Sequence, residues 1–202
     1  MQNSDLSKIG ESSISDVISN SIGNDLMGIH GRYEVKCFDK DGNLKWRDVI
    51  DNLVTDEGKK FILDLCFGTG TYSSSYMGLI SSVGYTAVAV GDTAAQINGT
   101  NAWKEAGTAS NFPLIGGTTL RLAPSWAAAA KNTNVDKATS AAVSFTIGAT
   151  GGTLKGCIIV INGTSALGNA TGKLYSAGTF SGGDKVVSAS DTLNVSYTTS
   201  LT

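Results

Sequence analysis

The sequence predicts a mainly β protein, a sandwich or barrel with one short helix at about residues 56–67 and an N-terminal arm. Strand-like runs recur at intervals of roughly 8 to 20 residues, and clusters of Gly, Asn, Asp and Ser separate them. A length of 202 residues suits a single β-rich domain. Residues 1–30 differ in composition, because they are rich in Ser and Asn and contain no aromatic residue. We therefore divide the chain into an arm, residues 1–30, and one β-rich domain, residues 31–202.

The arm contains apolar residues at the spacing of an amphipathic helix. We call these residues the arm stripe: Ile14, Val17, Ile18, Ile22 and Leu26. A short amphipathic helix is marginal by itself and needs a surface for its apolar side. Two interpretations stay open at this point. The arm packs on its own domain, or it docks on another subunit, which would make the arm stripe a candidate contact with a partner.

A β-hairpin is predicted for residues 32–50, where apolar and polar residues alternate on both sides of a polar turn. The dipeptide Asp41-Gly42 is a strong turn signal, because Gly tolerates a positive φ and Asp bonds its own backbone. The turn also resembles part of a calcium-binding loop. However, Cys37 would take the place of the first oxygen ligand, and the flanking residues alternate as strands do. We therefore predict a turn and no metal site.

A helix follows the hairpin, with Thr55 as its N-cap, acidic residues in its first turn and Gly68 just past its end. Later strands are predicted over residues 76–83, 86–90, 118–122, 126–130, 141–147, 154–161, 173–180 and 192–197, with a helical turn at 93–97 in an irregular stretch over 92–107. The apolar run Cys157–Ile161 indicates a strand that is buried on both faces.

Composition argues against several classes of function. The formal net charge is −2 and no basic run is longer than Lys59-Lys60, so we expect no nucleic-acid partner. No apolar run approaches the ~20 residues of a membrane span, and we expect neither a membrane partner nor a secretory signal. The three cysteines are far apart, which predicts buried apolar positions and no disulfide or zinc site. Charged residues make up only 16%, which fits a surface that packs against neighbours.

Catalysis is not expected either. The single histidine, His30, lies in a glycine-flanked segment that we predict to be a hinge. The acidic pairs are predicted to serve turns and a helix start: Asp39/Asp41, Asp48/Asp51 and Asp56/Glu57. A pair of carboxylates across a cleft stays possible, because sequence spacing does not reveal it. We predict no enzyme activity, cofactor or metal. Three tryptophans are predicted to lie in the core or in an interface: Trp46, Trp103 and Trp126.

Several stretches in order resemble a family of small structural proteins of tailed bacteriophages. They are Cys37–Trp46, Asn52–Lys59, Tyr76–Ile80, Ala87–Ala94, Trp103–Glu105, Leu174–Gly178, Gly183-Asp184 and Asp191–Val195, and they cover the chain from about residue 32 to about residue 200. The arm lies outside this likeness.

The resemblance implies a capsid decoration, or cement, protein with a jelly-roll-like β domain and no catalytic residues. Such a protein would bind the major capsid protein on the outside of the head as a homo-oligomer, a dimer or a trimer. It would be located on the virion after assembly in the host cytoplasm. The alternative is a tail or head fibre component that binds glycans of the host surface.

Overall fold

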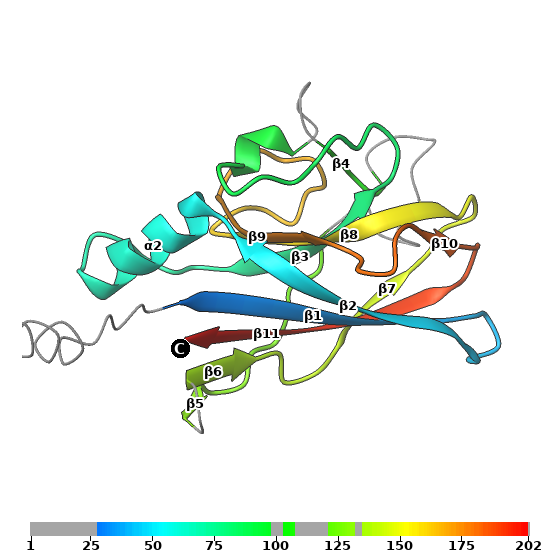
Figure 1. Ribbon diagram of the computed structural model, residues 1–202, viewed down its shortest axis with the longest axis horizontal. Helices are drawn as coiled ribbons and strands as arrows, with labels where there is room; N and C mark the ends of the chain where they lie inside the picture. Colours follow the sequence, from blue (N-terminus) through cyan, green and yellow to red (C-terminus); the bar gives the residue numbers. More distant parts are fainter. Residues whose placement is uncertain (1–27, 98–102, 108–120, 132–134, 202) are drawn as a thin grey trace, which may run out of the picture.

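The computed structural model describes residues 28–97, 103–107, 121–131 and 135–201. Within these ranges the chain is mainly β, with one α-helix, as predicted (Figure 1). The elements are β1 (Ile29–Phe38), β2 (Leu44–Val54), α2 (Asp56–Cys66), β3 (Ser75–Ser81), the 3-10 helix η1 (Ala94–Gln96), β4 (Lys104–Glu105), β5 (Ala130–Lys131), β6 (Val135–Ala138), β7 (Val143–Thr146), β8 (Gly152–Ile161), β9 (Lys173–Thr179), β10 (Lys185–Val187) and β11 (Thr192–Leu201).

The strands form an open antiparallel sheet that folds over into two layers. Its order is β4-β3-β8-β9-β2-β1-β11-β6-β5, while β10 pairs with β8 and β7 pairs with β11. Strand β2 belongs to both layers, because most of it pairs with β1 and its last two residues, Leu53 and Val54, pair with β9. Figure 1 shows β8 and β9 above β1 and β11. Of the two predicted architectures, this is the sandwich.

The core lies between the two layers. Alternate residues of β1 and β11 point into it, as the two-residue period of a strand requires. They meet residues of β3, β8 and β9 from the other layer, and the cluster includes Tyr33, Val35, Leu193, Val195, Met77, Leu79, Ile159 and Tyr175. A second cluster on the far side of β8 contains Ile158 and Val160, which pack with Trp103 and Ile97. Strand β8 is therefore buried on both faces, which confirms the prediction from its apolar run.

The predicted hairpin and helix are confirmed. The Asp39 carboxylate accepts the backbone N–H groups of Asp41, at 2.9 Å, and Asn43, at 2.8 Å, while Gly42 takes a φ of 85°. These contacts close the turn between β1 and β2. Helix α2 begins at Asp56, where the Thr55 hydroxyl accepts the N–H of Gly58 at 3.1 Å.

Other predicted elements are wrong. Residues 86–90 form no strand, because the Asp92 carboxylate accepts the N–H of Ala89 and shapes this segment as a loop. Of residues 126–130, only Ala130 lies in a strand, and Trp126 makes an isolated bridge to Thr139. Residues 118–120 lie outside the described residues. The short strands β4, β6 and β10 were not predicted, because two to four residues give no measurable alternation.

The hinge predicted around His30 is also wrong. Strand β1 begins at Ile29, which pairs with Leu201, so His30 is an exposed strand residue opposite Ser200. The reason is that β11 extends four residues beyond its predicted end at Tyr197 and continues the ladder to the start of β1. The arm stripe lies outside the described residues.

Candidate functional site

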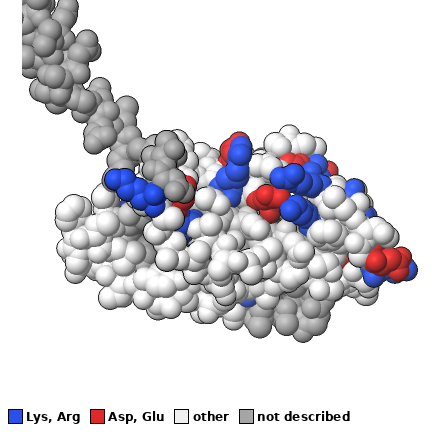
Figure 2. Space-filling view, turned by 90° about the horizontal axis from the view of Figure 1, so that it is seen from below, with Lys and Arg blue, Asp and Glu red and all other residues white. Residues whose placement is uncertain are grey.

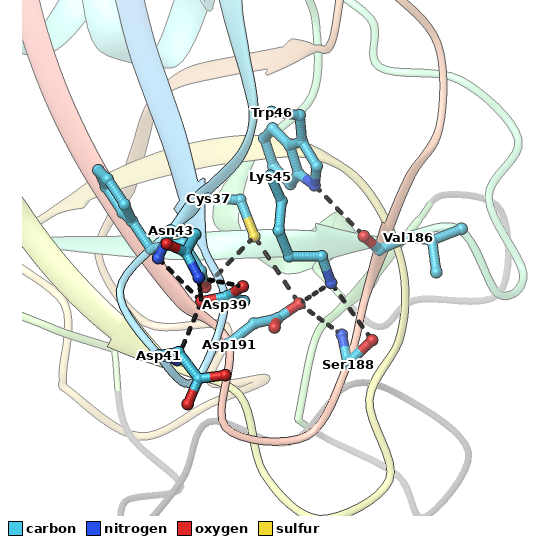
Figure 3. Close-up of polar contacts among 10 residues, drawn as sticks. Cys37, Asp39, Asp41, Asn43, Lys45, Trp46, Val186, Ser188 and Asp191 are labelled. Carbon is cyan, nitrogen blue, oxygen red and sulfur yellow. Dashed lines mark hydrogen bonds and ion pairs between the residues drawn. The ribbon is translucent and has the colours of Figure 1, made fainter.

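The cluster that most resembles a catalytic centre lies beside the β1–β2 hairpin (Figure 3). The carboxylate of Asp191, at the start of β11, is buried and accepts three donors. These are the ammonium of Lys45 at 2.5 Å, the backbone N–H of Ser188 at 2.7 Å and the thiol of Cys37 at 3.8 Å. A thiol, a carboxylate and an ammonium group therefore meet at one point.

This cluster is unsuited to nucleophilic chemistry. Burial, together with the negative charge of Asp191, raises the pKa of the Cys37 thiol to about 12. The thiolate is the reactive form of cysteine, so Cys37 is protonated and inert at neutral pH. The hydrogen bond to Asp191 raises the pKa of Lys45, which keeps that side chain charged. The cluster fastens the turn before β11 to strand β2.

Asp48 is the centre of a second buried group of hydrogen bonds. Its carboxylate accepts the Lys185 ammonium at 2.6 Å, the Ser181 hydroxyl at 2.7 Å and the N–H of Gly182 at 3.1 Å. Burial alone would raise the pKa of Asp48, but hydrogen bonds, first of all from Lys185, lower it to about 2. The prediction that Asp48 and Asp51 serve a turn is wrong, because β2 runs through both positions. Asp51 is exposed and pairs with Arg32 across β1 and β2.

Two further carboxylates bind segments that are distant in sequence. Glu105 on β4 makes a two-bond pair with Arg121, at 2.8 and 3.0 Å, and both side chains are fully buried. Glu105 also accepts the N–H of Gly168 at 2.6 Å. Glu57, in the first turn of α2, accepts the N–H groups of Leu174 at 2.7 Å and Ala94 at 3.0 Å. The predicted position of Asp56 and Glu57 at a helix start is confirmed.

No motif in the sequence marks Arg121, Glu105 or Lys185 as part of an ion pair. One signal for Arg121 was present, because a charged residue between Leu120 and Leu122 interrupts an apolar run. Its partner lies 16 residues away and nothing in the sequence relates the two. Taken together, the buried carboxylates act as acceptors for donors from several segments, which is a structural use of charge. Among the described residues no group of three His, Cys, Asp or Glu side chains is arranged to hold a metal ion.

The tryptophans and cysteines follow their predictions in part. Trp103 is fully buried and donates to Asp92 at 3.0 Å, while Trp46 and Trp126 are half-buried. None of the three forms an open aromatic platform. Cys37 and Cys157 are buried as predicted. Cys66 is exposed, and that prediction is wrong, because only one side of α2 packs on the sandwich and Cys66 ends the helix on its open side.

One layer of the sandwich presents an uncharged strip along β7 and β11, beside the charged residues Arg32, Glu34 and Lys36 of β1. The side chains of β7 and β11 that point away from the core are all small and polar. We call them the outer face: Ser144, Thr146, Thr192, Asn194, Ser196, Thr198 and Ser200. In the ladder Asn194 lies opposite Ser144, whose hydroxyl donates to it at 2.6 Å. Figure 2, which looks at the lower side of the view in Figure 1, shows charged side chains in a band with a wide uncharged region beside them.

The end of the sandwich near α2 contains a cavity of about 490 Å³, which we call the end cavity. Helix α2 forms one wall with Phe61, Ile62 and Leu65. The opposite wall includes Ile29 of β1 and Leu201 of β11, so the first and last described strands both end at the cavity. Its lining is almost wholly apolar. The size lies in the range of pockets that bind small molecules or side-chain clusters.

No helix in the described part of the chain is long and apolar enough to cross a bilayer. Comparison with known proteins gives no match to a family model, to a curated protein or to a solved structure.

Proposed function

We propose that the protein is a structural component of a tailed-bacteriophage particle that binds the outside of the capsid lattice as a cement, or decoration, protein. The proposed partners are the major capsid protein and further copies of this chain. The proposal starts from the resemblance of residues 32–200 to structural phage proteins. The observation that carries it is the outer face, a strip of small polar side chains along β7 and β11, on a sandwich whose buried carboxylates serve to hold the fold.

The chemistry of the outer face suits a flat contact that is repeated many times. Long charged side chains lose about 1.5–2 kcal/mol of conformational entropy each when a contact immobilises them, and shorter side chains lose less. Ser, Thr and Asn also offer both donors and acceptors, so that a partner can satisfy them without paired charges. A contact of this kind is insensitive to salt, because it does not depend on screened ion pairs.

Rigidity supports the same function. A cement protein must transmit load between capsid subunits without deforming. Asp48 ties the β9–β10 turn to β2, and Asp191 ties the turn before β11 to the same strand. Glu105 connects β4 with Arg121 and with the loop at Gly168. The arm stripe is a second candidate contact with the capsid, because its helix needs an apolar surface.

The proposal is tested with purified heads that lack the protein. The full chain and heads are mixed, the heads are sedimented, and the bound protein is quantified together with the temperature at which the heads rupture. We expect saturable binding and a higher rupture temperature. Thr146→Lys places a charge on the exposed outer face and should abolish binding. Thr71→Lys adds the same charge at an exposed position between α2 and β3 and should bind normally.

Absence of binding by the unmodified chain would overturn the proposal. Equal binding of both lysine variants would refute the assignment to the outer face. The alternative function, a fibre component that binds host glycans, is separated by a glycan array probed with the same protein. A specific glycan signal without binding to heads would favour that alternative. The positions of Trp46, Trp103 and Trp126 give it no support, because all three are buried or half-buried.

A further inference from the structure

The end cavity leaves apolar side chains facing an open space at one end of the sandwich. Phe61, Ile62 and Leu65 line it from α2, and Ile159 and Ile161 line it from β8. Apolar surface that faces water is unfavourable in proportion to its area. A continuous apolar hollow of this kind commonly marks a binding site. The described residues supply no side chain that fills it.

A polar group in the same lining also lacks a partner. Asp136 of β6 lines the end cavity, and its Oδ1 atom is buried without a hydrogen bond from any described residue. A buried acceptor without a donor is destabilising, and most such atoms in folded proteins are satisfied. The apolar lining calls for an occupant that is itself mostly apolar.

The arm has this chemistry. The arm stripe supplies four branched aliphatic residues of Ile and Leu type and one Val on one side of a helix, with Ser and Asn donors between them. The arm is also attached at the correct place. Ile29 lies in the cavity wall, and Leu26 precedes it by three residues, which span at most about 10 Å. Gly28 lies between them and can adopt the backbone angles of a sharp reversal.

We infer that the arm folds back at Gly28 and that the arm stripe occupies the end cavity of its own chain. Attachment next to the cavity gives the arm an effective concentration in the millimolar range, which a second molecule does not reach in dilute solution. This inference does not depend on the proposed function. If a capsid also binds the arm stripe, it must first withdraw it from this cavity.

The test uses the full chain and a matched pair of variants. Ile18→Asp with Ile22→Asp places two charges on the arm stripe. Asn20→Asp with Asn24→Asp places the same two charges on the side of the helix away from Ile18 and Ile22. The probe is anilinonaphthalene sulfonate, a dye whose fluorescence increases in apolar sites. We expect weak fluorescence from the unmodified chain and from the Asn pair, and a several-fold increase from the Ile pair, because charged residues cannot enter the cavity.

A second measurement locates the arm directly. A photoreactive benzoylphenylalanine replaces Ile18, and the crosslinked peptides are identified by mass spectrometry. Crosslinks to α2 or to β11 within a single chain are expected. Crosslinks between two chains would overturn the inference in favour of arm exchange between copies. Strong dye binding by the unmodified chain would show an empty cavity and would also overturn it. A lipid that copurifies with the unmodified chain would assign the cavity to that ligand instead.

Discussion

The Asp48 carboxylate lies 2.6 Å from the Lys185 ammonium, and both side chains are largely shielded from water. The pair connects the middle of β2 to β10, which belong to opposite layers of the sandwich. Its environment also favours one protonation state, since the pKa of Asp48 falls from 3.8 to about 2. The charge of Asp48 is therefore coupled to folding.

Removal of that charge should destabilise the protein at neutral pH. Because the pKa of Asp48 is lower in the folded state, its contribution is full above pH 4 and is lost as the pH falls toward about 2. We expect Asp48→Asn to lower the free energy of unfolding by about 2 kcal/mol at pH 7 and by much less near pH 2. Urea denaturation at both pH values measures this. The control is Asp51→Asn, which breaks an exposed ion pair with Arg32 and should have little effect on stability. A pH-independent effect of Asp48→Asn would contradict the coupling.

Arg121→Met should remove the two hydrogen bonds and the positive charge that Arg121 gives to the buried carboxylate of Glu105. Breaking a buried ion pair by removing one partner costs about 3–5 kcal/mol. The double variant Arg121→Met with Glu105→Leu removes both charges and should recover a large part of that loss. Thermal unfolding of the three proteins decides this, and equal stability of the single and double variants would refute the uncompensated charge as the cause.

The Thr55 side chain makes two hydrogen bonds at the junction between β2 and α2. Its hydroxyl accepts the N–H of Gly58 and donates to the carbonyl of Leu174 on β9. Thr55→Ala should therefore lower the free energy of unfolding by about 2 kcal/mol, more than the loss of a solvent-exposed cap. Thr55→Ser retains the hydroxyl and should stay within about 1 kcal/mol of the unmodified protein. Denaturant titration compares them, and similar losses in both variants would assign the effect to the methyl group.

Strands β8 and β9 approach each other closely at two glycines. A Cβ atom on Gly156 would collide with the backbone carbonyl of Gly178, which cannot move without breaking the ladder. Gly156→Ala should cost more than about 3 kcal/mol and reduce the soluble yield. A Cβ on Gly91 meets no atom within 4 Å, so Gly91→Ala is the control and should be neutral. Normal stability of Gly156→Ala would show that β8 and β9 are further apart.

The three cysteines should react very differently with a thiol reagent. Cys66 is exposed, whereas Cys37 and Cys157 are buried, and burial raises the pKa of both buried thiols. At about pH 8 the native protein should take up one alkyl group, at Cys66, and the unfolded protein should take up three. Mass spectrometry with peptide mapping gives the count and the position. Rapid alkylation of Cys37 in the native state would contradict the packing around Asp191.

Strands could be predicted from the sequence where they are long and their alternation of residues is strong. Strands β1, β2, β8 and β11 have ten or eleven residues each, and alternation or a continuous apolar run marks each of them. Strands β4, β6 and β10 were missed because tertiary pairing alone makes them strands. Helix α2 was predictable from Thr55 and Gly68, whose roles are local.

The candidate surfaces were less accessible to sequence reasoning. The outer face could have been found, because Thr192, Asn194 and Ser196 alternate with apolar residues along β11. The end cavity could not, because its walls come from α2 and from strands at both ends of the chain. The sequence indicates that the arm stripe needs an apolar surface. Only the fold shows that the end cavity begins at Ile29, three residues after Leu26, the last residue of the arm stripe.

The pairing of β1 with β11 also imposes a delay on folding during synthesis. Ile29 lies opposite Leu201, and more than 150 residues separate the end of β1 from the start of its partner β11 along the chain. Ribosomes add about 5–20 residues per second, so β1 waits roughly 10 to 30 s for this partner. During that interval β2 is the only neighbour of β1 in the ladder, and the other edge of β1 is unpaired. That edge of β1 is therefore open to chaperones and to neighbouring nascent chains until β11 covers it.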